Sequence, residues 1–256
     1  MKILLLNPNI SNSVTQLIQH EAQRAALPDT EITAETVDMG VAYIETPAES
    51  VVAAYASFVH LAQCHTAYDG VVIAAYGDPG VAQAKELFPI PVVGLTESAL
   101  ASAFLLGGRF GIVGISKRIG YWYQQTLEAL GMSHRFIGYQ GLGRAFSDVG
   151  AVQDEARAAL LRMCLQQVDA GADTIILAGA PLAGLARQIE SQVPVPLVDG
   201  VGSAVRMVET LVRSNYQPRR AGPLAPPPAK PNQQMNPALA ALFAGQSDAI
   251  AGGARS

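Results

Sequence analysis

The sequence predicts an α/β protein made of two similar doubly wound parallel-sheet halves, related by a pseudo-twofold axis, with a ligand cleft between them. Short apolar runs rich in Val, Ile and Leu alternate with longer segments of helical period. This alternation is typical of buried parallel strands joined by helices. The apolar run that begins at Asp69 also returns at Asp173, 104 residues later. Alternation and repeat together predict the fold class.

Eight segments have the length and composition of strands. They are residues 2–7, 31–38, 70–76 and 91–95 in the first half, and 109–115, 135–139, 174–179 and 196–200 in the second. Segment 31–38 alternates in polarity, which suits a strand at a sheet edge. Helical periodicity is clearest in 14–27, 50–68, 152–170 and 202–213.

The internal repeat sets the predicted boundaries. Asp69–Ala75 matches Asp173–Gly179 at an offset of 104 residues, and the Pro91 and Pro196 segments match at an offset of 105. We therefore expect one half over 1–105 and another over 106–215, with the last helix crossing back onto the first half. Residues 216–256 are rich in Pro and Ala and read as an extended linker. Within it, Pro237–Gly245 is either a short amphipathic helix that docks on this or a neighbouring subunit, or part of a disordered tail.

Composition limits the class of partner. Half of the residues are hydrophobic, 15% are charged and the net charge is −4, so the chain offers no basic surface for nucleic acid or anionic lipid. No apolar run is long enough to span a membrane. The two cysteines, Cys64 and Cys164, form neither a disulfide framework nor a Cys/His ligand cluster, and their helical positions favour buried packing. We expect a cytoplasmic protein with a small-molecule partner, and a homo-oligomer because of its exposed helix faces.

The loops after the strands are where a ligand is expected, since open parallel sheets bind ligands beyond the carboxyl ends of their strands. The first such loop carries Asn7, Asn9 and Ser11 before a helix, and amides, hydroxyls and free N–H groups there suit an anion. An ordinary capping turn is the alternative. After strand 70–76 comes Asp78, which either caps the helix that follows it or acts as a base at the cleft.

An ordered set of motifs resembles the aspartate/glutamate/hydantoin racemase superfamily, and within it the hydantoin and allantoin racemases. The motifs are NPN near the start, Gly40, Ile44-Glu45, DGVVIAAYGDPG, PVVGLTESA, ILAGAPLAGL and PLVDGV. They extend over most of residues 1–213. The resemblance implies a two-domain α/β fold, no cofactor, and a substrate with a carboxylate or ureide group bound between the halves.

The resemblance also implies a pair of catalytic cysteines, one after a strand of each half. In the family one thiolate removes a proton from the substrate carbon, and the other thiol delivers a proton to the opposite face. The matching positions here are Ala75 and Gly179, which the internal repeat also pairs. Neither side chain has an acidic proton that it could exchange with a substrate, so this chain does not use a two-thiol mechanism. A natural thiol-free chain is favoured over engineered removal, because Cys→Gly is an unusual inactivating change.

Other polar residues at the predicted strand ends are candidates for the chemistry. For catalysis they are Tyr76, Asp78 and Glu45, as general base or acid. For substrate binding they are Asn7, Asn9, Ser11, Tyr43, Thr96, Ser116, Arg118, Gly179, Ala180, Pro181 and Asp199. Several have structural alternatives: Thr96 as a helix cap and Asp199 as a turn residue, for example.

Three functions remain open at this point. The first is an enzyme that acts on a small hydantoin-like, thiohydantoin-like or amino-acid-derived compound by hydrolysis, elimination or one-base isomerisation. The second is a hydantoin or allantoin racemase inactivated at both cysteine positions. The third is a non-catalytic protein that binds a small molecule.

Overall fold

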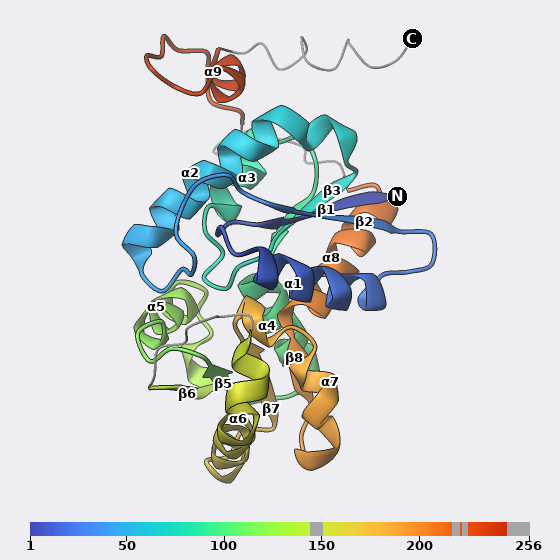
Figure 1. Cartoon of the computed structure of the whole chain (residues 1–256), viewed down its shortest axis with the longest axis vertical. Helices are drawn as coiled ribbons and strands as arrows, with labels where there is room; N and C mark the ends of the chain where they lie inside the picture. Colours follow the sequence, from blue (N-terminus) through green and yellow to red (C-terminus); the bar gives the residue numbers. More distant parts are fainter. Residues whose placement is uncertain (144–150, 217–220, 222–224, 245–256) are drawn as a thin grey trace.

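Two four-stranded parallel sheets form the core of the protein (Figure 1). The computed structural model describes residues 1–143, 151–216, 221 and 225–244. The first sheet has the order β2-β1-β3-β4 and the second the order β6-β5-β7-β8. The strands are β1 Lys2–Asn7, β2 Glu31–Thr36, β3 Gly70–Ile73, β4 Val92–Gly94, β5 Phe110–Gly114, β6 Phe136–Gly141, β7 Thr174–Ala178 and β8 Leu197–Asp199. The same order in both sheets confirms the predicted fold class, and every predicted strand is present.

Helices cover both faces of each sheet. Within the described residues the α-helices are α1 Asn12–Ala25, α2 Pro47–Cys64, α3 Val81–Leu87, α4 Leu95–Leu106, α5 Gly120–Ala129, α6 Val152–Asp169, α7 Leu185–Ile189, α8 Gly200–Arg213 and α9 Pro237–Phe243. The four helices with clear sequence periodicity are α1, α2, α6 and α8. Helices α4 and α5 were not among the segments singled out from the sequence.

Local sequence explains where α2 and β2 begin and end. Thr46 caps α2: its hydroxyl accepts the Glu49 N–H, and the Glu49 carboxylate accepts the Thr46 N–H, with Pro47 in the first turn. Strand β2 pairs only with β1, at the edge of the first sheet. The alternating pattern of its sequence predicted this position.

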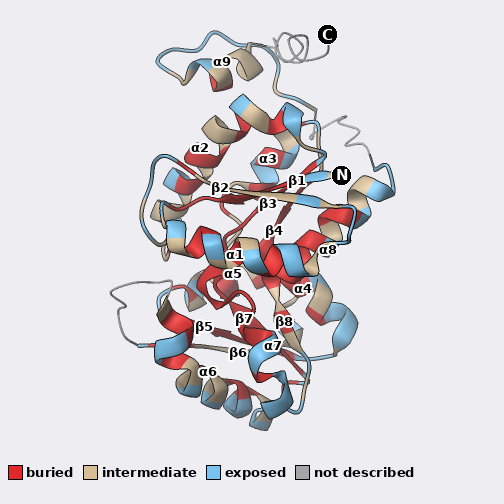
Figure 2. Cartoon of the chain, turned by 45° about the vertical axis from the view of Figure 1, so that its right-hand side comes forward, coloured by how far each residue is buried: buried red, intermediate tan, exposed pale blue. Residues whose placement is uncertain are grey.

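Side chains that alternate along the strands build separate inner and outer cores. Along β1, Ile3 and Leu5 face the inner core, whereas Leu4 and Leu6 face the outer one. The inner core contains residues of both sheets together with α1, α4, α5 and α8. Figure 2 shows buried residues concentrated along the sheets and between the two halves. The halves therefore share one hydrophobic core.

Helices α4 and α8 are exchanged between the halves. Helix α8 follows the second sheet but packs on β3 and β4 of the first sheet, and α4 follows the first sheet but packs on β7 and β8. The fit of α8 on β3 is close: a Cβ placed on Gly70 would lie 2.7 Å from Val208 Cγ2. Because α4 and α8 also contact each other, the relative orientation of the two sheets is fixed.

The tail folds back on the first half. Helix α9 (Pro237–Phe243) lies against α2, and its Leu239 is 2% exposed among the outer core residues. The Asn236 side chain accepts the Ala238 N–H at 3.0 Å and so starts this helix. A helix thus forms in the predicted segment and contacts its own chain, while Gly245 lies outside the described residues. None of the helices in the described part of the chain is long and apolar enough to cross a bilayer.

We predict that Leu239→Ala releases α9 from the body of the protein. Removing a buried leucine side chain costs about 2 kcal/mol or more, and an isolated helix of 7 residues is not stable alone. Hydrogen exchange at residues 238–243 should then become fast, while exchange in β1 and β3 stays slow. Gln233→Ala, at an exposed position of the same tail, is the control. Unchanged protection of α9 in Leu239→Ala would contradict the docking.

Candidate active site

A small cavity lies where the carboxyl ends of β3 and β7 meet. Its volume is about 20 Å³, enough for about one water molecule, and it is partly open to solvent. Its lining residues are Asn9, Tyr43, Ile44, Ala75, Tyr76, Ile119, Tyr123, Gly179 and Ala180. Both halves contribute to this lining, and five of the residues proposed from sequence are among them. The described lining contains no histidine, cysteine or carboxylate and therefore no set of metal ligands.

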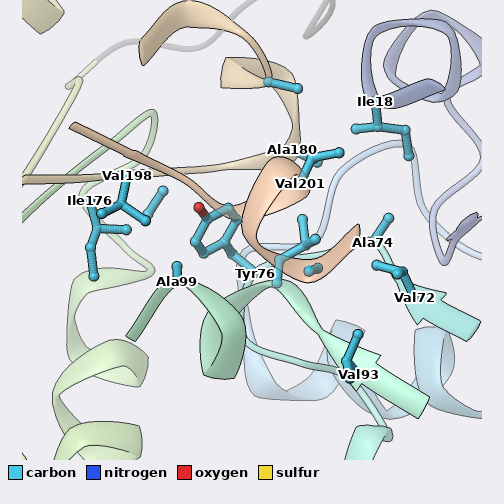
Figure 3. Packing of buried hydrophobic residues seen from close by; sticks show 14 of the residues in the cluster. Ile18, Val72, Ala74, Tyr76, Val93, Ala99, Ile176, Ala180, Val198 and Val201 are labelled. Carbon is cyan, nitrogen blue, oxygen red and sulfur yellow. The ribbon is translucent and has the colours of Figure 1, made fainter. Parts of the chain in front are cut away.

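Tyr76 connects the two halves beside this cavity. Its ring is packed among buried side chains of both halves, including Ala99, Ile176 and Val198 (Figure 3). Its hydroxyl donates a hydrogen bond of 2.9 Å to the Leu177 carbonyl in β7. Burial raises the pKa of the Tyr76 phenol well above its ordinary value. Tyr76 therefore stays protonated, and its proton is already used in a contact between the halves.

The loop after β1 presents Asn9 to the cavity. The Asn7 amide donates to Asn9 Oδ1 at 3.0 Å and to Thr15 Oγ1 at 2.9 Å. The Ser11 N–H also donates to Asn9 Oδ1, at 2.8 Å, and the Ser11 hydroxyl caps α1. The Asn9 carbonyl oxygen is thus held from two sides, so its amide nitrogen is the group left to donate to a ligand.

Asp78 caps a helix, but not the one that follows it in the sequence. Its carboxylate accepts the N–H groups of Thr96 and Glu97 in α4, both at 2.8 Å. One of the two roles expected for Asp78 was to cap the helix that follows it, α3. That expectation is wrong, because the N-cap of α3 is Gly80. Burial raises the pKa of the Asp78 carboxyl to about 7. Since Asp78 does not line the cavity, its proposed role as a base remains a prediction.

Asp199 caps the start of α8 in the same way as Asp78 caps the start of α4. It accepts N–H groups from Val201 at 2.9 Å and Gly202 at 3.2 Å in α8, and from Gly184 at 2.6 Å. Burial raises the pKa of this carboxyl too.

The two carboxylates occupy equivalent places in the two halves. Asp199 is the last residue of β8, and the residue in the same register of the first sheet is Gly94. A Cβ placed on Gly94 would lie 2.3 Å from Asp78 Oδ1. The loop carboxylate of the first half therefore fills the space that the strand-end carboxylate takes in the second.

The other residues proposed from sequence support the loops around the cavity. The Thr96 hydroxyl accepts the Gly77 N–H at 2.7 Å, and the Pro181 carbonyl accepts a hydrogen bond from Gln153. The Ser116 hydroxyl accepts the Arg118 N–H at 3.2 Å, and Arg118 itself is exposed. None of these four residues lines the cavity. Direct contact between them and a ligand remains a prediction.

Tyr123 is a cavity residue that the sequence analysis missed. Its side chain is 2% exposed, and its hydroxyl has no hydrogen-bond partner within the described residues. Burial raises the pKa of this phenol well above its ordinary value. A buried hydroxyl without a partner is costly, and a ligand in the cavity would satisfy it. No signal in the sequence pointed to Tyr123, and the sequence analysis also missed Ile119, the apolar lining residue four positions earlier.

Tyr43 and Glu45 lie on the loop between β2 and α2. Tyr43 lines the cavity, and burial together with the nearby charge of Glu45 raises the pKa of its phenol. The Glu45 backbone N–H donates to the Glu49 carboxylate at 2.8 Å. The Glu45 carboxylate itself has no hydrogen-bond or ion-pair partner within the described residues. Glu45 follows the lining residue Ile44 but does not itself line the cavity, so its role as a base, like that of Asp78, remains a prediction.

Ala75 and Gly179 both line the cavity, as the internal repeat predicts for equivalent positions. The backbone of Gly179 has φ +142°, in a region that residues with a Cβ rarely adopt. The space around it is ordinary, with Leu182 Cγ 3.8 Å from a Cβ placed there. A larger residue at position 179 is therefore opposed by the backbone conformation and not by crowding.

Comparisons with known proteins agree with this architecture. The profile of the family described as Asp/Glu/Hydantoin racemase matches residues 3–208. The chain is 32% identical over 238 residues to a hydantoin racemase of Paenarthrobacter aurescens, covering 90% of this chain and 99% of that protein. The allantoin racemase structure from Klebsiella pneumoniae has a TM-score of 0.88 at 31% identity and covers 93% of this chain and 98% of its own. The allantoin racemase of Pseudomonas fluorescens has a TM-score of 0.83 at 31% identity, over 92% and 100% of the two chains.

We predict different effects on the free energy of unfolding for two Tyr→Phe substitutions in this cavity. Tyr76→Phe leaves the buried Leu177 carbonyl without its donor and should lower the free energy of unfolding by about 1–2 kcal/mol. Tyr123→Phe removes a hydroxyl that has no partner and should leave the free energy unchanged or raise it slightly. Urea denaturation of both variants measures the difference. An equal loss in both would contradict the hydrogen-bond assignment.

The pKa of Asp78 predicts a pH-dependent stability. The folded protein binds this proton more tightly than the unfolded chain, whose Asp pKa is 3.8. The stabilisation from Asp78 is therefore complete below about pH 4 and is lost as the pH rises through about 7. Asp78→Asn stays neutral at every pH, so its stability relative to the wild type should rise between pH 4 and pH 8. A stability difference that does not depend on pH would show that Asp78 is ionised throughout.

Proposed function

The chain belongs to the Asp/Glu/hydantoin racemase family, and we propose that it is a cofactor-independent enzyme that acts on a small hydantoin-like, thiohydantoin-like or amino-acid-derived compound by chemistry that uses no thiol. Hydrolysis, elimination and one-base isomerisation are the reactions in question. The observation that carries the proposal is the pair Ala75 and Gly179 in the cavity lining, where neither face of a bound substrate meets a thiol.

The lining favours a neutral ureide ring over a free carboxylate. The Asn9 amide and the Tyr123 hydroxyl are both hydrogen-bond donors, and no lysine or arginine lies in the described lining. A ring carbonyl oxygen can accept from these donors, whereas a carboxylate would be buried without a cation. Hydantoin and allantoin, after which relatives of this chain are named, carry such carbonyl groups.

The raised pKa values of Tyr43 and Tyr123 suit them to donate protons in hydrogen bonds rather than to remove them. A phenol that stays protonated stabilises negative charge that develops on a carbonyl oxygen, in an enolate or a tetrahedral intermediate. We assign this role to Tyr123. Glu45 is then the group that takes a proton, either from the substrate carbon or from a water molecule. The space left by Ala75 and Gly179 would admit that water.

The second candidate is a hydantoin or allantoin racemase that has lost both cysteines. The identity of 32% to a hydantoin racemase favours it, and so does the free space around a Cβ at position 179. The φ of +142° at Gly179 argues against it, because a cysteine there would have to change the backbone.

Proton NMR in D2O tests the leading proposal. With 5-substituted hydantoins, thiohydantoins and allantoin, we expect the wild type to exchange the α-proton or to form a ring-opened or cleaved product. Tyr123→Phe should reduce the rate about 100-fold, as loss of one oxyanion donor does, and Glu45→Gln should reduce it at least as much. Lys117→Gln, at an exposed position outside the cavity lining, is the control. Binding without any reaction across the panel would contradict the proposal and leave the inactivated racemase and the binding protein as candidates.

The double substitution Ala75→Cys and Gly179→Cys separates the two enzyme candidates. If the chain is an inactivated racemase, the folded double variant should gain α-proton exchange with inversion at the carbon. If the site has adapted to other chemistry, the strain at position 179 should lower stability by about 1–3 kcal/mol and racemisation should stay absent. Gain of racemase activity would favour the second candidate.

A further inference from the structure

A second cluster of reactive side chains lies away from the cavity, between the edge strand β2 and helix α2. Glu35 comes from β2, and His60 and Cys64 come from α2. His60 Nε2 lies 2.5 Å from Glu35 Oε2. One ligand atom from each of the three residues lies within 4.8 Å of the other two. A carboxylate oxygen, an imidazole nitrogen and a sulfur atom thus converge at one point.

The cluster is held by the fold. His60 and Cys64 are four residues apart and therefore lie on the same face of α2. The Tyr68 hydroxyl donates a hydrogen bond of 2.7 Å to Glu35 Oε1. This contact orients the carboxylate and directs its other oxygen, Oε2, towards His60. Such outer hydrogen bonds position the ligands in metal sites.

The sequence analysis found no Cys/His ligand cluster, and the reason is geometric. His60 and Cys64 alone are only two ligands within one helix. The third, Glu35, stands 25 residues before His60 and reaches the pair only because α2 packs over the edge strand. His60 and Glu35 are each less than one-third exposed, so the cluster is partly shielded from water.

We propose that Glu35, His60 and Cys64 form a binding site for Zn²⁺ or a divalent cation of similar chemistry. Zn²⁺ takes four tetrahedral ligands from sulfur, nitrogen and oxygen, so these three residues leave one position for water. On binding, the Cys64 thiol releases its proton to solvent. The proton that His60 Nε2 shares with Glu35 moves to Nδ1 by way of solvent, so that the Nε2 lone pair is free to bind the metal. The hydrogen bond between His60 and Glu35 is exchanged for two metal–ligand bonds.

The site would stabilise the loop that carries Tyr43 and Glu45. That loop lies between β2 and α2, the two elements that supply the ligands. A metal that joins these elements would restrict the loop mainly at its start, because Glu35 lies at the end of β2 whereas His60 and Cys64 lie near the end of α2. The expected effect is structural, so it does not depend on which reaction the cavity performs.

Titration of the untagged full-length protein with Co²⁺ tests the proposal, because a cobalt–thiolate bond absorbs in the near ultraviolet. We expect one equivalent of Co²⁺ to give this charge-transfer band together with the visible bands of a tetrahedral site. One equivalent of Zn²⁺ should remove both and raise the melting temperature. Absence of a thiolate band under anaerobic, neutral conditions would overturn the proposal.

Matched variants assign the ligands. Cys64→Ser and His60→Ala should lose the cobalt–thiolate band or weaken Co²⁺ binding at least tenfold. Cys164→Ser and His20→Ala, at the other cysteine and at an exposed histidine, should keep it. A band that survives Cys64→Ser and disappears in Cys164→Ser would refute the assignment.

A measurement on the wild-type protein tests the site even if the variants do not fold. Zn²⁺ should slow alkylation of Cys64 at least tenfold, as followed by peptide mass spectrometry. An alkylation rate of Cys64 that Zn²⁺ does not change would overturn the site even if no variant folds.

Discussion

The exchange of α4 and α8 between the two sheets is the constraint on which the cavity depends. Each helix follows one sheet and packs on the other, so the inner core belongs to both halves. Tyr76 adds a directional contact at the same interface, through its hydrogen bond to Leu177. Because the halves cannot turn independently, Ala75 and Gly179 remain in one small cavity. The lining is thus fixed in advance, whereas a small ring must widen a cavity of about 20 Å³ in order to bind.

Two buried carboxylates then fix the loops relative to the exchanged helices. Asp78 holds the start of α4, and Asp199 holds the start of α8 together with the Gly184 turn. Asp78, proposed for catalysis, and Asp199, proposed for substrate binding, thus also hold the framework. Among the described residues, the groups without a structural partner include the Asn9 amide nitrogen, the Tyr123 hydroxyl and the Glu45 carboxylate. Polar residues near a cavity can thus be divided into structural and candidate ligand-binding residues by asking which of their atoms are already hydrogen-bonded.

Much of the fold was predictable because its signals can be read directly from the sequence. The apolar strands and the alternation of segment 31–38 depend on neighbouring residues, and the repeat of Asp69 at Asp173 appears when the two halves of the sequence are compared. The target of Asp78 was not predictable, because the helix it caps begins 17 residues later than Asp78 itself. Tyr123 and the cluster around Glu35 were not predicted from the sequence for the same physical reason. Their roles arise from contacts between elements, and no spacing in the sequence encodes those contacts.

The structure of a complex with a 5-substituted hydantoin is the most direct test of the proposed site. The ring should lie between Ala75 and Gly179, with one carbonyl oxygen within hydrogen-bond distance of the Tyr123 hydroxyl and another polar atom near Asn9. The carboxylate of Glu45 should face the substrate carbon or a water molecule beside it. A hydantoin bound elsewhere on the protein, or bound in the cavity while Tyr123 still lacks a partner, would contradict the account.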